Sequence, residues 1–185
     1  MCSKTQLRKI YRDKRNSLST QWVQQHSAKV CHTIANHPIF HDSTTVAIYQ
    51  ALGNEVDLSA LLTLPKTFVL PVIGSHNSMA FHVYAKNKEM VQNKYGILEP
   101  NKTPLIKPQE IDLCCLPLLA FNKKGIRLGM GGGYYDRYFA LNAMQHKPTI
   151  LVGIAYEWQE SATIVAQKWD IPLDYIFTNK EVIKT

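Results

Sequence analysis

The hydrophobic residues near the N-terminus recur at the spacing of one side of a helix. Those expected to pack inward are Leu7, Ile10, Tyr11 and Leu18. Ser3 and Gln6 have the spacing of a capping box, which predicts the start of the helix. Basic residues on another side recur at the same intervals, namely Lys4, Arg8, Arg12 and Arg15. The pattern predicts a basic helix whose charged face is either solvated or binds an anion.

A second helix is predicted over residues 20–35. Its apolar contacts are expected to be Val23, Val30 and Ile34. It should stop at residues 36–38, because Pro38 disfavours helical backbone in the residue before it. Residues 3–35 are therefore expected to form a basic N-terminal helical segment packed on an α/β core over residues 44–180.

From residue 44 onward the apolar runs become short and alternate with polar or helical segments. Strands are expected at residues 45–49, 67–73, 79–84, 111–119, 149–155 and 175–178. Short helices are expected at 57–64 and from Tyr134 to about Met144, with a turn at 52–54. Residues 85–110 are polar and punctuated by proline, which indicates a long surface connection. This alternation is typical of an α/β fold with a parallel or mixed sheet.

Length and composition indicate one globular domain. The chain has 185 residues, of which 45% are hydrophobic, enough for a packed core. The start lacks the apolar stretch of a signal peptide, and no apolar run is long enough to span a bilayer. We expect a cytoplasmic protein with no membrane partner. The cysteines at 2, 31, 114 and 115 lack C-x-x-C spacing, so reduced thiols are expected, with the adjacent pair buried in a strand.

A net charge of +7 predicts an anionic partner, which can be a nucleic acid, a phosphate-bearing metabolite or a polycarboxylate. No helix-turn-helix, zinc-finger or RNP pattern supports nucleic-acid binding. A hydrolase or metalloenzyme is also poorly supported, because G-x-S-x-G and H-E-x-x-H are absent and the seven histidines have no ligand spacing.

Four glycines between Arg127 and Asp136 form the most informative segment of the chain. Clustered glycines allow several backbone N–H groups to approach phosphate oxygens, Arg127 can neutralise their charge, and Asp136 can hold the accompanying Mg²⁺. The spacing matches neither the dinucleotide-binding G-x-G-x-x-G pattern nor a Walker A loop. The alternative is a glycine-rich turn that begins a helix, with Asp136 complementing the helix dipole.

Other polar residues are expected at the ends of strands, where ligands bind in open α/β sheets. Glu55 follows the strand that ends near Gln50, the glycine-rich segment follows the strand over 111–119, and Asp174 precedes the last strand. From position alone, each carboxylate is more often a solvated loop residue than a site residue.

Together with its surroundings, the segment over residues 112–137 resembles the signature of 5-formyltetrahydrofolate cyclo-ligases, also called 5,10-methenyltetrahydrofolate synthetases. Further elements occur in family order, namely Lys4-x-x-x-Arg8, Gln50-x-x-x-x-Glu55-Val56-Asp57, Leu70-Pro71-Val72, Tyr95-Gly96-Ile97-Leu98-Glu99-Pro100 and Asp174. The resemblance covers nearly the whole chain. Met130 is a departure, since bacterial relatives usually carry an aromatic residue there and eukaryotic relatives a basic one, and Gly132 replaces a lysine seen in many eukaryotic members.

The resemblance implies a single-domain, three-layer α/β/α fold of the NagB/RpiA/CoA transferase-like type. It also implies an enzyme that uses ATP and Mg²⁺ to convert 5-formyltetrahydrofolate to 5,10-methenyltetrahydrofolate, releasing ADP and phosphate. The formyl oxygen would be phosphorylated, and the nitrogen at folate position 10 would then displace it. The implied partners are ATP and the folate, possibly polyglutamylated, with no nucleic acid and with the protein as a monomer. The alternative is a re-purposed relative that binds ATP or folate without turnover.

The resemblance also implies a role for particular residues. Those implied in catalysis are Lys4, Arg127 and Asp136. Those implied in ATP binding are Lys4, Arg8, Arg127, Leu128, Gly129, Met130, Gly131, Gly132, Gly133, Tyr134 and Tyr135. Those implied in folate binding are Gln50, Glu55, Met130, Tyr134 and Tyr135, although either tyrosine can equally be a core aromatic. Asp136 and Asp174 are the implied metal ligands.

Overall fold

The structure is a computed structural model that describes residues 3–141 and 149–185. Its centre is an eight-stranded sheet with the order β12-β11-β10-β7-β1-β2-β3-β6. The strands are β1 (Thr45–Ala47), β2 (Thr67–Ile73), β3 (Met79–Val83), β6 (Leu105–Ile106), β7 (Leu113–Pro117), β10 (Ile150–Ile154), β11 (Tyr175–Phe177) and β12 (Val182–Lys184). The strands from β11 to β2 are parallel neighbours, whereas β3, β6 and β12 join the edges in antiparallel pairs. The expected α/β fold with a mixed sheet is therefore confirmed.

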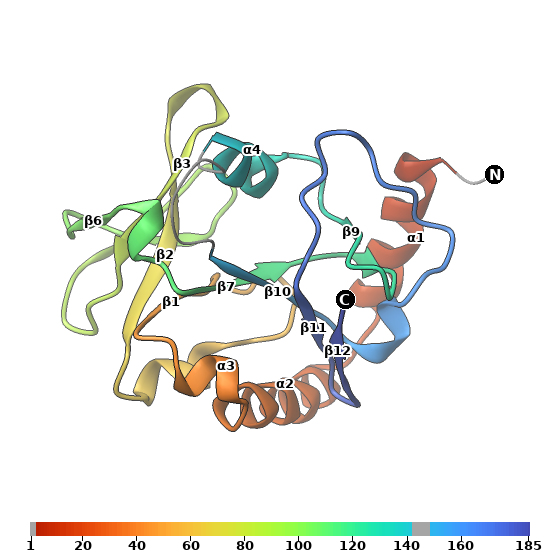
Figure 1. Cartoon of the computed structure of the whole chain (residues 1–185), viewed down its shortest axis with the longest axis horizontal. Helices are drawn as coiled ribbons and strands as arrows, with labels where there is room; N and C mark the ends of the chain where they lie inside the picture. The colour runs from red at the N-terminus through yellow and green to blue at the C-terminus, as the bar shows by residue number, and fades with distance from the viewer. Residues whose placement is uncertain (1–2, 142–148) are drawn as a thin grey trace.

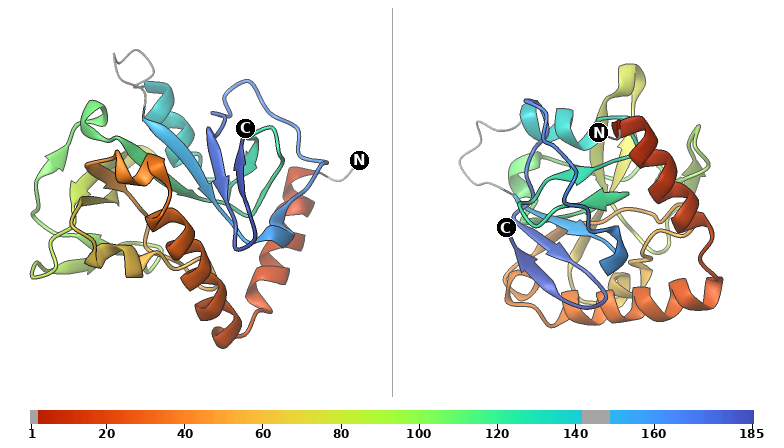
Figure 2. Two further views of the ribbon diagram at one scale, coloured as in Figure 1. Left: turned by 60° about the horizontal axis from the view of Figure 1, so that its bottom comes forward. Right: turned by 90° about the vertical axis from the view of Figure 1, so that its right-hand side faces the viewer.

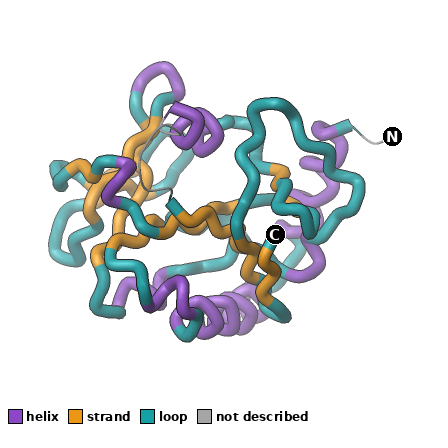
Figure 3. The backbone as a smooth tube through the Cα atoms, viewed as in Figure 1, coloured by secondary structure: helices purple, strands orange, loops and turns teal. Residues whose placement is uncertain are grey.

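Helices lie on both sides of this sheet (Figure 1). They are α1 (Lys4–Asn16), α2 (Thr20–Ala35), α3 (Pro38–His41) and α4 (Tyr134–Leu141), with short 3-10 turns at Ser59–Thr63, Ser75–Asn77, Pro108–Glu110 and Glu157–Gln159. Two small antiparallel pairs stand apart from the sheet, β4 (Met90–Gln92) with β5 (Leu98–Pro100) and β8 (Ala120–Phe121) with β9 (Arg127–Leu128). Strands run through the middle of the molecule and helices lie outside them (Figure 3).

The core follows the alternation of side chains along the central strands. Val46 and Leu70 face a cluster that includes Val30 and Ile34 of α2 and Phe40 of α3. Their strand neighbours Ala47 and Val69 face the opposite cluster, which includes Tyr138 of α4. Successive side chains of a strand point to opposite faces, so each short buried strand contributes to both clusters. The three-layer description stays a prediction, because α4 is the single described helix on its face.

Helix α1 lies beside the sheet, and it diverges from α2 after the turn that joins them (Figure 2). Its Leu7 packs with Leu128 of β9 and Ile164 in a small separate cluster. The predicted capping box is present, with Ser3 accepting a hydrogen bond from the Gln6 backbone. The inward position expected for Ile10 is wrong, because its side chain is 55% exposed. Because α1 packs against a small surface, fewer of its apolar side chains are buried than the sequence pattern indicates.

The regular elements with strong patterns were predicted well. Helix α2 and strand β2 have the bounds expected for residues 20–35 and 67–73. The connection expected over residues 85–110 lies largely at the surface, but its expected lack of strands is wrong, because β4, β5 and β6 form within it. These strands have two or three residues each, too few to show a period. The helix expected at 57–64 is a 3-10 turn, and the expected helix end near Met144 lies outside the described residues.

The thiols of Cys31, Cys114 and Cys115 are free and buried, as expected for the adjacent pair. Burial raises the pKa of the Cys31 thiol to about 12, and the nearby Asp57 charge acts in the same direction. Among the described helices, none has the length and apolar character needed to cross a bilayer.

Leu70→Ala is expected to lower the free energy of unfolding by about 2–5 kcal/mol, because the side chain is 0% exposed between α2 and the sheet. The matched control is Leu105→Ala in β6, where the side chain is 58% exposed and the expected change is within about 0.5 kcal/mol. Urea denaturation measures both. Equal losses in the two variants would contradict the assignment of Leu70 to the core.

Candidate active site

A cavity of about 840 Å³ opens beside the carboxyl ends of β2 and β7. Helix α1, the Tyr49–Glu55 turn, the loop that carries Tyr95 and the glycine-rich segment all contribute to its wall. Every site residue expected from the sequence lines this cavity except Asp174. Polar loops and a helix N-terminus at the ends of parallel strands form the usual ligand site of such sheets.

The glycine-rich segment forms the loop that connects β9 to α4. Gly131 and Gly133 have φ of 103° and 64°, in the left-handed region that glycine adopts readily. Helix α4 begins directly after them, so backbone N–H groups at its first turn have no partner within the helix. Arg8 of α1 contacts the loop, with its Nε donating to the Gly129 carbonyl at 3.0 Å. The loop therefore offers glycine backbone and a helix N-terminus, a combination suited to anions.

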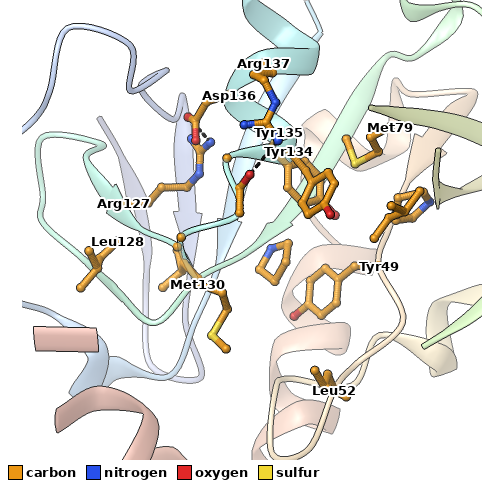
Figure 4. A pocket seen from close by; sticks show the side chains of 18 of the residues that line it. Tyr49, Leu52, Met79, Arg127, Leu128, Met130, Tyr134, Tyr135, Asp136 and Arg137 are labelled. Carbon is orange, nitrogen blue, oxygen red and sulfur yellow. Dashed lines mark hydrogen bonds and ion pairs between the residues drawn. The ribbon is translucent and has the colours of Figure 1, made fainter. Parts of the chain in front are cut away.

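Arg127, which is buried, and Asp136, which is a quarter exposed, form an ion pair beside this loop, with Nη2 and Oδ1 2.5 Å apart (Figure 4). Arg127 also donates through Nη1 to the Ile171 carbonyl at 2.6 Å, and the Ile171 N–H donates to Asp136 Oδ1 at 3.2 Å. The second oxygen of Asp136, Oδ2, accepts from no described residue. The pair is thus charge-neutral and leaves one carboxylate oxygen for a cation.

Lys4 reaches the same end of the cavity and pairs with Asp170, Nζ and Oδ2 being 2.8 Å apart. Burial of Asp170 opposes its ionisation, but the hydrogen bonds from Lys4 and the Gln167 backbone and the charges of Lys4 and Arg127 hold its pKa below the usual range. Sequence reasoning missed Asp170. Like Asp174 it precedes β11, but in the structure it lines the cavity and pairs with Lys4.

The opposite end of the cavity is more apolar and has a buried carboxylate. Tyr49, Leu52 and Met79 lie across from Met130 of the glycine-rich loop (Figure 4). Glu55 is 8% exposed, and its Oε1 accepts from Arg15 Nη1 at 2.8 Å. Burial raises the pKa of Glu55, while the Arg15 charge and the Leu52 N–H act in the opposite direction.

The two predicted tyrosines have different surroundings. The Tyr134 hydroxyl donates to Asn77 Oδ1 at 3.2 Å and lies 3.0 Å from the Tyr95 hydroxyl, so it links three loops around the cavity. Tyr135 is half-buried and packs against Phe81, and burial raises its pKa well above the usual range. Tyr134 is therefore the more available of the two for a ligand.

Asp174 lies outside the cavity wall. Its Oδ2 accepts from the Leu151 N–H at 2.8 Å, and its own N–H donates to the Leu151 carbonyl, which joins the start of β11 to β10. The metal role expected for Asp174 stays a prediction. Within residues 3–141 and 149–185, no group of three or more His, Cys, Asp or Glu side chains has the arrangement of a metal site.

Lys4→Met is expected to raise the pKa of Asp170 toward its ordinary value, because it removes both the hydrogen bond and the charge of Lys4. Since the folded-state pKa is depressed, the pair stabilises the fold above the unfolded-state pKa, near 4, and the effect is lost as the pH falls through the folded pKa. NMR titration of the carboxyl groups measures the shift. An unchanged Asp170 titration would show that Lys4 does not stabilise the carboxylate.

Comparison with known proteins gives one consistent result. The family model of the 5-formyltetrahydrofolate cyclo-ligase family matches residues 1–179. The 5-formyltetrahydrofolate cyclo-ligase of Haemophilus influenzae is 34% identical over 182 residues, covering 92% of each chain. That of Escherichia coli is 31% identical over 181 residues, covering 94% of this chain and 98% of the relative.

Solved structures agree with the sequence relatives. The 5,10-methenyltetrahydrofolate synthetase of Aquifex aeolicus superposes with a TM-score of 0.86 at 31% identity, covering 98% of this chain and 92% of the other. The synthetase of Mycoplasma pneumoniae gives a TM-score of 0.77 at 28% identity, with coverage of 96% and 99%. The resemblance noted in the sequence is thereby confirmed, and the chain belongs to the 5-formyltetrahydrofolate cyclo-ligase family.

Proposed function

We propose that this chain is a 5-formyltetrahydrofolate cyclo-ligase, which converts 5-formyltetrahydrofolate and ATP to 5,10-methenyltetrahydrofolate, ADP and phosphate. The observation that carries the proposal is one cavity with two chemically different ends. One end has the glycine-rich loop with Lys4 and Arg8, and the other has apolar side chains around Glu55. A nucleotide and a flat, donor-bearing ring system therefore fit side by side.

The reaction needs both ligands in contact, because the formyl oxygen is a poor leaving group until it is phosphorylated. That oxygen bonds to the γ-phosphorus while the bond from phosphorus to the β,γ-bridging oxygen breaks, which releases ADP. The nitrogen at folate position 10 then attacks the formyl carbon and loses its proton, while the carbon–oxygen bond breaks and phosphate departs. The protein's contribution is to position the two ligands and to neutralise phosphate charge.

The residues at the end of the cavity that has the glycine-rich loop are suited to bind ATP. The N–H groups of the glycine-rich loop and of the first turn of α4 are suited to phosphate oxygens. Lys4 and Arg8 of α1 line the same wall and add positive charge. Arg127 supplies a further cation on the phosphate side once Asp136 has another counter-charge.

Mg²⁺ fits this end as the partner of ATP. Asp136 has Oδ2 available, and Asp170 lines the same part of the cavity. Mg²⁺ that accompanies nucleotides is usually held by one or two carboxylates together with phosphate oxygens and water, which agrees with a site that lacks a protein-only cage among the described residues. When bound, the ion neutralises negative charge on the phosphate oxygens.

The apolar end accounts for the folate role. The pterin ring carries amino and ring N–H groups that a carboxylate such as Glu55 can accept as a pair. Gln50, Met130 and Tyr134 line the same cavity and are available to enclose the ring. We further propose that the protein is a monomer, and that its net charge of +7 favours folates with a polyglutamate tail.

A re-purposed relative without turnover is the alternative. It is less well supported, because Lys4, Arg127 and Asp136 are all present and line one cavity.

The direct test mixes the purified protein with 5-formyltetrahydrofolate and MgATP and follows the absorbance of the methenyl product. We expect product only when ATP is present, with phosphate released in equal amount. A folded protein that binds both ligands yet forms no product would favour the re-purposed relative instead.

The metal roles are tested by the Mg²⁺ concentration needed for half-maximal turnover. Asp136→Asn and Asp170→Asn are expected to raise it roughly tenfold or more, the scale of a lost charge-assisted contact. Asp174→Asn is the matched variant outside the cavity, where a smaller change is expected because its carboxylate binds the Leu151 N–H. A larger effect at Asp174 than at Asp170 would reverse this ranking.

A further inference from the structure

Arg15 differs from the other cations of α1. Its side chain is 3% exposed, whereas Arg12 and Lys14 on the same helix are exposed to solvent. The guanidinium reaches inward to the Glu55 carboxylate with Nη1 and Oε1 2.8 Å apart. The buried cation of α1 therefore pairs with Glu55, the carboxylate that is proposed to bind the folate.

We infer that Arg15 is a positioning residue for folate recognition, which fixes the orientation and the negative charge of Glu55 so that both carboxylate oxygens accept pterin N–H groups. The inference rests on the proposed function, since it deepens the role of the same cavity. Arg15 is not among the described residues that line the main cavity, so it acts through Glu55.

The hydrogen bonds of Glu55 leave room for a paired donor. Oε1 accepts from Arg15, and Oε2 accepts from the Leu52 N–H at 3.0 Å. Each carboxylate oxygen has two acceptor directions, so one direction on each oxygen stays available. Two parallel N–H groups of one ring edge match that arrangement.

The turn that carries Glu55 is fixed to the end of α1 by a second contact. The Asn54 side chain donates through Nδ2 to the Arg15 carbonyl at 3.1 Å and to the Leu18 carbonyl at 2.9 Å. Arg15 also contacts Met130 of the glycine-rich loop, with Nη2 and Sδ 4.0 Å apart. The residue therefore lies between the Glu55 turn and the loop on the other side of the cavity.

The charge of Glu55 depends on this arrangement. A protonated Glu55 would present one donor and would no longer accept two N–H groups. Burial raises the pKa of Glu55, and the Arg15 charge is the largest influence in the opposite direction. Removal of the Arg15 charge therefore raises that pKa further, so Glu55 becomes protonated at a higher pH than in the wild type.

A purely structural role for the pair is the competing explanation, and it predicts different results. A pair that merely holds α1 against the turn would affect ATP binding as much as folate binding, because Lys4 and Arg8 lie on the same helix. It would also act whether or not Glu55 carries a charge. Folate-selective effects that require the Glu55 carboxylate separate the two roles.

The experiment compares Arg15→Met, Arg15→Lys, Glu55→Gln and the double variant Arg15→Met/Glu55→Gln. Lys9→Met is the matched control, because Lys9 is an exposed cation of the same helix that pairs with Asp13. Calorimetry without ATP measures the affinity for 5-formyltetrahydrofolate between pH 6 and 9, and a parallel titration measures the affinity for MgATP. Circular dichroism confirms that each variant is folded.

We expect Arg15→Met to weaken folate binding about tenfold at pH 7, with the affinity recovering as the pH rises and Glu55 ionises. MgATP affinity should change less than threefold, Arg15→Lys should restore part of the folate affinity, and Lys9→Met should match the wild type. In the Glu55→Gln background, adding Arg15→Met should change folate affinity less than threefold, because Arg15 acts through the carboxylate.

The double variant also keeps the test decisive if Arg15→Met alone does not fold, since it removes the unpaired buried carboxylate. Equal losses of folate and MgATP affinity, or a large further loss in the double variant, would overturn the inference. Folate binding by the wild type without turnover would overturn the proposed catalysis alone. Absence of folate binding by the wild type would overturn both.

Discussion

The position of α1 depends on the ion pairs and hydrogen bonds that its basic side chains make with the rest of the protein. Leu7 is the main apolar contact of this helix, so polar contacts determine much of its position. Lys4 pairs with Asp170, Arg8 donates to the glycine-rich loop, and Arg15 pairs with Glu55. Successive turns of one helix thereby reach the two ends of a single cavity.

Ion pairs and hydrogen bonds at the cavity also connect segments that are distant in the sequence. Arg127 and Asp136 both bind the backbone of Ile171, and Asp170 beside it binds Lys4. The segment before β11 is therefore held by the glycine-rich loop on one side and by α1 on the other. Ionic contacts of this kind contribute little to stability when exposed and are costly when one partner is lost from the interior. We propose that their clustering at the cavity serves ligand binding rather than folding.

The sequence predicts the elements that have a clear period or a clear boundary signal. Residues 20–35 and 67–73 have such signals, and the structure has those bounds. The three short strands within residues 85–110 form because neighbouring segments pair with them, which a local pattern does not contain. The residues expected at the site line one cavity, apart from Asp174, but the burial of Arg15 depends on Glu55, 40 positions away. Periodicity placed Arg15 on a basic face and could not identify its partner.

The pairing of Arg127 with Asp136 has a consequence for the proposed nucleotide. Each charge neutralises the other in this partly buried pair, so neither is fully available to a ligand that binds alone. MgATP brings a cation and an anion together, and it can therefore give each member of the pair a new partner of opposite charge. Neither side chain is left with an uncompensated charge in that exchange. A free phosphate or a free metal ion would give a new partner to just one of the two, and we propose that the arrangement favours the metal–nucleotide complex over its separate components.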